Sequence, residues 1–470
     1  MKRLIIFLLL CVSVASAQVS GTAVLNVGGP SPLHVSATNP LYFEDASGQI
    51  VYLAGMHTNV DVQTLSDQPT LDYAGFINRL VSHNMNYLRL WVWEQSKFVP
   101  YSTAGVTVTP NWYLRSLTCC GGDGLNKFDT TKFNDAGYFA NLRSRIIQAQ
   151  NAGIYVSVML FQGFSVGWGL YTPPGHVANA WPGHPYNANN NINSLSGDPT
   201  ASGQGGQTEA NNIAAITAVQ DAYIQHVVAQ VGDLPNIIWE IGNEMWGSLT
   251  STAAQILAFQ NHVMATVRAA DSNRHPVVMV TFSDINGAVQ NADIFGSTAD
   301  MVSPGDGSVF TLPDFAKNLA GAPRPVLLDT DHIGFTNDPT VIWDHFIKGY
   351  QALELNDALD AAHEPVANAI GDTLIWSKKI DLKHSVSQYC TTAGAGQFCL
   401  VNAGVSYLGM STTGGTFAMN MSGNSNTFGV QWYDLATRGP VVNGPNVTGG
   451  SSTQSFTSPF GSHASVLLVK

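Results

Sequence analysis

Two glutamates four residues apart occur in the stretch NIIWEIGNEMWG, residues 236–247. The stretch is otherwise largely apolar and is typical of a buried strand, where a carboxylate is costly unless it is paired or has a function. Glu240 and Glu244 share one parity along an extended strand, so both can face the same side. Glu244, beside the amide of Asn243, suits general acid/base chemistry. Glu240 would lie deeper, and we expect Arg89 to pair with it.

A second acidic group occurs in LLDTDHI, residues 327–333. Asp329 and Asp331 share a parity if this run is extended, and His332 follows them. A carboxylate across from Glu244 would complete the pair that cleaves a glycosidic bond, in which one acid protonates the leaving oxygen and the other attacks the anomeric carbon or activates water. We expect Asp331 to be this second carboxylate, with Asp329 as its alternate. The sequence leaves retention and inversion of the anomeric centre undecided.

The acids have alternative interpretations. Glu94 and Glu354, in the second and eighth strand candidates, could also supply the second carboxylate. The DTDHIG turn begins like a calcium loop, but its fifth position is Ile333 and its twelfth is Thr340 rather than the Glu that such a loop needs. We therefore predict no metal site and no cofactor.

These acids need a scaffold that brings strand ends together. Short apolar or β-branched runs alternate with stretches of helical spacing over about 300 residues. The runs are 51–59, 85–94, 153–163, 236–244, 275–284, 300–306, 324–333 and 350–357. The alternation predicts a (β/α)8 TIM barrel, in which chemistry occurs at the carboxyl ends of the strands. A doubly wound sheet is the rival fold, but no Gly-rich phosphate turn follows the first run.

The flanking segments predict further parts. Residues 1–17 have a basic start, an apolar run and a small-residue cleavage motif, as in a secretory signal peptide. We expect 18–50 to form a β segment packed on the barrel, 51–384 the catalytic barrel, and 385–470 an antiparallel β-sandwich. The mature chain is therefore expected to be secreted, either extracellular or periplasmic.

Composition excludes some partners. The 470 residues carry a formal net charge of -12, with 20 Lys and Arg against 32 Asp and Glu. An acidic chain without a basic cluster is poorly suited to nucleic acid or anionic membranes, and we expect a monomer. Cys390 and Cys399 flank a Gly-rich turn and favour a hairpin disulfide, while Cys119 and Cys120 are adjacent and either bond or stay free.

A serine motif and several aromatic residues also need interpretation. GFSVG, residues 163–167, fits the G-x-S-x-G pattern of serine esterases, but VGWGLYTPPG follows Ser165 where a nucleophile elbow requires a helix. An esterase or peptidase that depends on Ser165 is therefore kept only as a third hypothesis, after the hydrolase and the inactive binding barrel. Aromatic faces suit the apolar faces of pyranose rings. The tryptophans that could serve in this way are Trp91, Trp93, Trp168, Trp181 and Trp246.

NIIWEIGNE resembles the fourth-strand Asn-Glu signature of the cellulase-like (β/α)8 glycoside hydrolases of the large retaining clan. NYLRLWVWE is similar to the second strand of that clan. The resemblance implies that Glu244 is the general acid/base, that Asn243 bonds the sugar 2-hydroxyl, and that Arg89 supports the nucleophile. The seventh strand departs from the pattern, because Thr330 stands between two aspartates where the clan has a glutamate. The clan's usual eighth-strand tryptophan is also not evident.

Longer segments resemble a group of secreted bacterial cellulase-like proteins that end in a β-sandwich of collagen-binding type. These segments are KFDTTKFNDAGYFANLRSRIIQAQNAGIYVSVMLFQG, HPYNANNNIN, DTDHIGF, YCTTAGAGQFCLVNAGVSYLGM, GVQWYDLATRG and SFTSPFGSHASVLLVK. The resemblance covers nearly the whole mature chain and implies the same two-part architecture.

The sequence thus predicts a secreted glycoside hydrolase that cleaves O-glycosidic bonds of a poly- or oligosaccharide. We expect substrate contacts from eight side chains: Asn243, Arg89, His332, Glu94, Trp93, Gln162, Trp246 and His57. The alternative is a catalytically inactive barrel that binds carbohydrate or matrix, which the missing seventh-strand glutamate favours.

Overall fold

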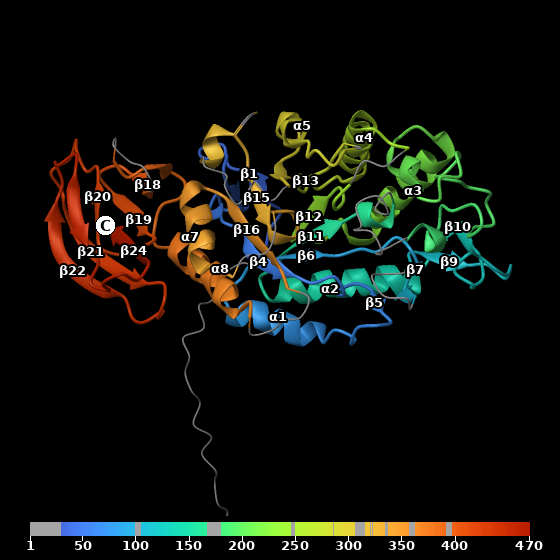
Figure 1. The fold of residues 1–470 in the computed structure, drawn as a ribbon, viewed down its shortest axis with the longest axis horizontal. Helices are drawn as coiled ribbons and strands as arrows, with labels where there is room; N and C mark the ends of the chain where they lie inside the picture. The colour runs from blue at the N-terminus through green and yellow to red at the C-terminus, as the bar shows by residue number, and fades with distance from the viewer. Residues whose placement is uncertain are drawn as a thin grey trace, which may run out of the picture.

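The computed structural model shows a helix-surrounded barrel and, at one end of the molecule, an antiparallel sheet domain formed by the C-terminal part of the chain (Figure 1). The described residues are 30–98, 105–166, 180–245, 250–284, 286–305, 315–319, 321, 323–333, 337–356, 362–391 and 397–470.

Eight parallel strands form the barrel. They are β4 (Ala54–His57), β6 (Tyr87–Leu90), β11 (Tyr155–Met159), β12 (Ile237–Glu240), β13 (Val277–Val280), β14 (Met301–Ser303), β15 (Leu327–Asp329) and β16 (Gln351–Leu355). Their order is β14-β13-β12-β11-β6-β4-β16-β15, and a parallel bridge between Val302 and Val326 links the first strand of this order to the last. Each strand lies within one of the eight predicted runs, so the predicted TIM barrel is confirmed.

Helices follow the strands and cover the outside of the barrel (Figure 1). They are α1 (Tyr73–Ser82), α2 (Ala140–Asn151), α3 (Ala214–Val231), α4 (Ala253–Ala270), α5 (Asn291–Gly296), α7 (Pro339–Lys348) and α8 (Glu364–Ser377). The short α6 (Thr330–Ile333) instead lies at the end of β15. A π-helical turn at Asp135–Phe139 precedes α2, and short 3-10 turns occur at Gly163–Ser165, Trp181–Gly183, Gly206–Glu209 and Ala316–Asn318. Capping fixes several starts: the Thr252 hydroxyl and the Gln255 side chain, for example, form a capping box on α4.

Alternation along the strands separates two buried layers. Ile238 of β12 packs inside the barrel, whereas its neighbour Trp239 packs in the layer that the helices cover. Leu33 and Phe43, from the segment before the barrel, join the inner layer and fill the amino-terminal end. The inner layer is therefore largely apolar at that end, whereas charged side chains such as Arg89 and Glu240 lie nearer the carboxyl ends of the strands.

Small antiparallel sheets surround the barrel. One precedes it and contains β1 (His34–Val35), β2 (Phe43–Glu44) and β3 (Ile50–Val51). Two others lie in the loops after β4 and β6 and contain β5 (Thr64–Leu65), β7 (Lys97–Phe98) and β8 (Val106–Thr109), and β9 (Tyr113–Arg115) and β10 (Phe128–Phe133). A bonded Cys119–Cys120 pair occurs in the loop between β9 and β10.

The C-terminal domain has a six-stranded antiparallel sheet and a two-stranded one. The larger contains, in order, β17 (Val386–Tyr389), β18 (Phe398–Asn402), β19 (Ser406–Ser411), β24 (Ser465–Val469), β21 (Thr427–Asp434) and β22 (Val442–Thr448). The smaller pairs β20 (Thr416–Met419) with β23 (Gln454–Thr457). A Cys390–Cys399 disulfide closes the β17–β18 hairpin.

One carboxylate of α8 ties this domain to the barrel. Asp372 accepts a hydrogen bond from the Tyr433 hydroxyl at 2.7 Å and two from the Arg438 guanidinium at 2.8 and 2.9 Å. The Tyr433 ring also packs against Trp343 and Trp376. Aromatic packing around a bidentate ion pair fixes the two parts against each other.

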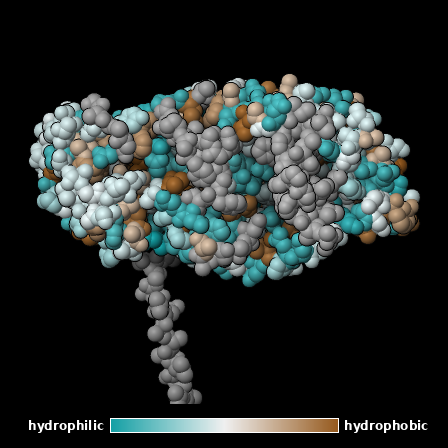
Figure 2. Space-filling view, viewed as in Figure 1, coloured by the Kyte–Doolittle hydropathy of each residue, from teal (hydrophilic) through white to brown (hydrophobic). Residues whose placement is uncertain are grey.

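Hydrophilic residues are spread over the visible face of the molecule, with apolar residues in small groups (Figure 2). Among the described residues, no helix is long and apolar enough to cross a membrane.

Candidate active site

Arg89 is the centre of a buried polar cluster at the carboxyl ends of the strands. Its side chain lies on β6 and is fully buried. Arg89 Nε donates to Glu240 Oε1 at 2.6 Å, and Nη1 donates to Asp329 Oδ2 and to Asp331 Oδ2, both at 3.2 Å. Nη2 donates to Asn243 Oδ1 at 2.5 Å. One guanidinium therefore joins groups from β6, β12 and the end of β15, as a planar five-donor group can.

Glu240 has the partner that its sequence position required. It lies inside the barrel, 1% exposed, with Arg89 as its ion-pair partner. Burial raises the pKa of the Glu240 carboxyl, and the Arg89 charge opposes that rise. The expected Arg89–Glu240 pair is thus present, and Glu240 lies below the mouth of the barrel.

Asp329 is a carboxylate held in place on three sides. His57 Nε2 donates to Asp329 Oδ1 at 3.1 Å, the Asp331 backbone N–H donates to the same oxygen at 3.0 Å, and Arg89 donates to Oδ2. Although burial opposes it, the pKa of Asp329 lies well below its usual range because His57 and Arg89 stabilise the anion. Asp329 therefore remains ionised beneath the mouth although it is fully buried.

Asp331 has a different environment from Asp329. Its side chain is 12% exposed, and Arg89 is its ion-pair partner. Burial, and then the neighbouring Asp329 charge, raise the pKa of Asp331 to about 6. Two carboxyl groups beside one arginine thus have pKa values that are pushed apart, a pattern typical of acid and base groups in active sites.

The strand predicted over 324–333 is shorter than expected, so the shared strand parity of Asp329 and Asp331 was wrong. β15 ends at Asp329, and Thr330–Ile333 turns into the helical segment α6. The Asp329 carboxylate captures the Asp331 N–H, and the Thr330 hydroxyl accepts from the Leu355 N–H at 2.9 Å. Side-chain capture of backbone groups turns the chain here, and both acids still reach Arg89.

His332 connects the two sides of the barrel mouth. Its Nε2 lies 2.8 Å from Asn243 Oδ1 and its Nδ1 lies 2.7 Å from Ser303 Oγ. Burial lowers the pKa of His332 to about 3, so the ring is neutral. An N–H on Nε2 donates to Asn243, and Nδ1 then accepts from the Ser303 hydroxyl. Ser303 had no signal in the sequence beyond its place at the end of the sixth strand.

Glu244 stands at the mouth in a strained backbone conformation. β12 ends at Glu240, and Glu244 follows with φ at +38° and its side chain partly exposed. Non-glycine residues rarely adopt such a φ, and strain of this kind concentrates at functional sites. Gly163 backs the turn: its N–H donates to the Asn243 carbonyl at 2.7 Å, and a Cβ there would lie 2.2 Å from the Glu244 carbonyl oxygen.

Gln162 orients the Asn243 side chain with its amide oxygen, while its amide nitrogen has a different environment. Its Oε1 accepts from Asn243 Nδ2 at 3.0 Å and from the Phe164 N–H at 3.1 Å. Within the described part of the chain, its Nε2 is buried without a hydrogen-bond partner. A buried amide donor left unpaired beside Asn243 is a group that a ligand oxygen can satisfy.

Glu94 lies at the base of the loops above the third strand. It is 1% exposed; Oε1 accepts from the Gln162 N–H at 2.7 Å, and Oε2 accepts from His184 Nε2 at 3.1 Å. Trp93 is buried as well, and its indole N–H donates to the Asn59 carbonyl. His184 was missed in the sequence because it lies 90 residues from Glu94 in a loop without a motif.

The other residues that the sequence suggested for the site lie in different environments. The His57 ring stacks on Trp91, with ring centroids 5.8 Å apart. Trp246 and Trp168 lie outside the described residues. Ser165 is fully buried and donates to Gln95 Oε1, and among the described residues no histidine bonds its hydroxyl as the base of a serine nucleophile would. In the described ranges no group of three or more His, Cys, Asp or Glu side chains is placed to hold a metal ion.

Comparison with known proteins identifies the architecture. No family model and no curated protein matches the sequence. A glycoside hydrolase family 5 structure from Bacteroides vulgatus matches with a TM-score of 0.60 and 13% identity, covering 93% of this chain and 92% of that one. The chain has a glycoside hydrolase fold.

Two other solved structures share this glycoside hydrolase fold over the same extent. A candidate glycoside hydrolase from Bacteroides vulgatus has a TM-score of 0.63 and 14% identity, with 93% of this chain and 82% of that one covered. A further glycoside hydrolase gives 0.52 and 12%, with 93% and 96% covered. These structural matches cover 93% of the chain and establish its fold. At identities this low they do not establish its chemistry, which has to be inferred from the residues at the barrel mouth.

Proposed function

We propose that this chain is an exported glycoside hydrolase that cleaves O-glycosidic bonds of a poly- or oligosaccharide, with Glu244 as general acid/base and Asp331 as the second carboxylate. The observation that carries the proposal is the Arg89 cluster, in which the acids of the seventh strand end meet Asn243, the residue directly before Glu244. Two-carboxylate cleavage needs acids from different strands around one mouth.

Asp331 is a better second carboxylate than Asp329. Asp329 is fully buried and its oxygens accept from His57, Arg89 and the Asp331 N–H, so it holds neighbouring groups in place. Asp331 keeps partial exposure, and its contact with Arg89 matches the role that the clan resemblance gives this arginine. As a nucleophile or base Asp331 acts when ionised, which requires a pH above about 6.

The charge of the cluster suits the reaction. Glu240, Asp329 and Asp331 face the single guanidinium of Arg89, and His332 is neutral because burial lowers its pKa to about 3. Positive charge develops on the sugar ring as the glycosidic bond breaks. A fixed excess of negative charge in a poorly solvated site stabilises that transition state.

Substrate contacts follow from the same geometry. Asn243, held between Arg89 and His332, is placed for a sugar hydroxyl, and the Gln162 amide beside it has a free donor among its described surroundings. His57 ends β4, the strand beside β6, and Trp93 follows the end of β6 itself. Glu94 acts by fixing Gln162 and His184. The mechanism uses no cofactor.

A panel of neutral and charged polysaccharides, assayed for new reducing ends, tests the proposal. The wild type should release reducing sugar from at least one glycan, and Glu244→Gln and Asp331→Asn should each abolish that release while unfolding at or above the wild-type temperature. Binding of a glycan without turnover, unchanged by Glu244→Gln, would support the alternative of an inactive carbohydrate-binding barrel.

A further inference from the structure

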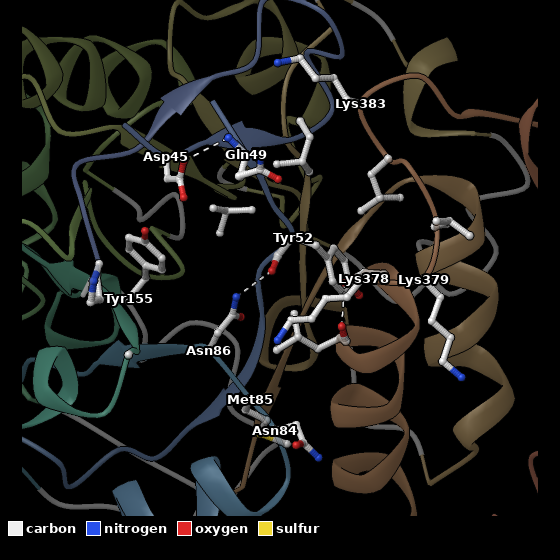
Figure 3. A pocket seen from close by; sticks show the side chains of 18 of the residues that line it. Asp45, Gln49, Tyr52, Asn84, Met85, Asn86, Tyr155, Lys378, Lys379 and Lys383 are labelled. Atoms are coloured by element: carbon white, nitrogen blue, oxygen red, sulfur yellow. Dashed lines mark hydrogen bonds between the residues drawn. The ribbon is translucent and has the colours of Figure 1, made fainter. Parts of the chain in front are cut away.

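A large groove lies at the opposite end of the barrel from the Arg89 cluster. Its volume is about 1000 Å³, and its lining includes Tyr52, Asn86 and Tyr155, which stand at the amino-terminal ends of β4, β6 and β11. The C-terminal end of α8 and the segment after it form the other wall (Figure 3). Ligand pockets reach roughly this volume at the upper end of their range, so the groove exceeds what one small ion needs.

Lysines gather around this groove. Four of the ten lysines of an acidic chain line it: Lys378, Lys379, Lys383 and Lys470. Lys378 and Lys379 follow α8, Lys383 lies in the segment after them, and Lys470 follows the last strand of the C-terminal domain. The dipole at the end of α8 therefore explains only the first two. Cations from separate parts of the fold converge on one cavity.

Not all of these ammonium groups are equally available. Lys383 Nζ lies 3.2 Å from Glu44 Oε1 and donates to the Gly48 carbonyl, and Lys470 Nζ donates to the Lys379 carbonyl. Lys379 lies over the Trp376 ring, and burial lowers the pKa of its ammonium. Lys378 is exposed, and its ammonium forms no hydrogen bond or ion pair with a described residue. Lys378 is therefore the cation most available to a ligand.

The acids of the groove are already occupied. Asp45 accepts from the N–H groups of Ser47 and Gln49 and from the Ser47 hydroxyl. Asp381 accepts from His384 Nδ1 at 2.6 Å and from the Lys383 N–H. Both carboxylates thus hold turns at the rim: Asp45 does so through Oδ1, and Asp381 also accepts from the Asn402 side-chain amide.

Neutral polar groups complete the lining. The side-chain amides of Gln49 and Asn84 are exposed and have no recorded partner among the described residues. The Tyr155 ring (Figure 3) and the partly buried Ile50 and Val51 add apolar surface to the lining. Amides, an aromatic ring and ammonium groups around one groove are suited to a molecule with many hydroxyls and a few negative charges.

We propose that this groove is a second binding site, for a carboxylate-bearing oligosaccharide, on the barrel end remote from the proposed catalytic acids. Lys378 and Lys379 pair with ligand carboxylates, and Gln49 and Asn84 bond ligand hydroxyls. The site does not depend on hydrolysis at the mouth, because the two sites lie at opposite ends of the same strands.

Calorimetric titration with trigalacturonate and with its fully methylated ester tests the site on the full chain. The two probes differ in charge and share the sugar. We expect the acid to bind at least about tenfold more tightly than the ester at low salt, with binding that weakens as salt rises. Lys378→Glu should weaken binding of the acid about tenfold, and Lys378→Arg should retain it.

Controls locate the effect. Lys132→Glu, at an exposed position on β10, should leave binding unchanged, and Glu244→Gln should bind the acid like the wild type, which separates this site from the mouth. Equal binding of acid and ester, indifference to Lys378→Glu, or displacement by an equal concentration of inorganic phosphate would each overturn the proposal, the last because it indicates a simple phosphate site.

Discussion

The two ends of the barrel carry charge in opposite ways. At the carboxyl ends of the strands, three carboxyl groups share one fully buried guanidinium. At the amino-terminal ends, lysines surround an open groove where water reaches them. The same eight strands thus support a desolvated acidic cluster at one end and a solvated basic rim at the other. Burying a charged group costs desolvation free energy and shifts its pKa. A solvated charge changes the free energy of folding little and is accessible to a ligand.

Removing the buried cation should have the largest effect. Arg89→Leu leaves Glu240, Asp329 and Asp331 without their shared counter-charge, so we expect a loss of about 3–5 kcal/mol in the free energy of unfolding. Urea unfolding at pH 7 measures it. Arg143→Leu is the matched control, because Arg143 pairs with Asp233 at the surface, and should cost less than about 1 kcal/mol. Similar losses of unfolding free energy in Arg89→Leu and Arg143→Leu would contradict the difference between buried and exposed charge.

Asp331→Asn should stabilise the fold while removing activity. The folded-state pKa of Asp331 is raised to about 6, so above that pH the native state contains a carboxylate that it disfavours relative to the unfolded chain. We expect a gain of about 1–3 kcal/mol at pH 7, which fades below about pH 4, where the carboxyl is neutral in both states. Thermal unfolding at both pH values measures it, and a lower stability at pH 7 would contradict the assignment.

Asp329→Asn should shift the pH profile of the reaction. Burial and then the Asp329 charge raise the pKa of Asp331, so removing that charge lowers it. The acidic limb of kcat/KM, near pH 6 in the wild type, should move to lower pH. Asp300→Asn, which alters a surface pair with Arg268, should leave the limb in place. A limb that stays or moves to higher pH in Asp329→Asn would show that Asp331 is not the titrating group.

The smallest effect should come from the open end. Lys378→Glu reverses an exposed charge that makes no recorded contact with a described residue, so we expect the free energy of unfolding to change by less than about 0.5 kcal/mol. The same thermal unfolding assay applies. A loss above about 1 kcal/mol would show that Lys378 supports the fold rather than a ligand.

Much of the scaffold was predictable because it depends on local patterns. Alternating apolar runs located all eight barrel strands, and strand parity brought Glu240 toward Arg89, a contact that the structure contains. The hairpins after β6 were not predicted, because their short strands lie in loops of mixed composition without a strong period.

The site was predictable only in part. His57–Asp329 and His332–Ser303 join residues from distant strands, and their contacts depend on the closed barrel rather than on spacing along the chain. The turn at Thr330 depends on capture of a backbone N–H by Asp329, which competes with the extended conformation that parity assumed. Sequence patterns therefore do not predict contacts that depend on closure of the barrel, or turns that depend on a side chain bonding a nearby backbone N–H.

The most direct test of the proposed catalytic pair compares leaving groups. Once a glycan is identified, kcat/KM of Glu244→Gln should fall about 100- to 10,000-fold on the polymer, whose leaving oxygen needs a proton. It should fall less than about tenfold on a dinitrophenyl glycoside of the same sugar, whose leaving group needs none. Asp331→Asn should lose activity on both. Wild-type activity of Glu244→Gln on the polymer would contradict the assignment.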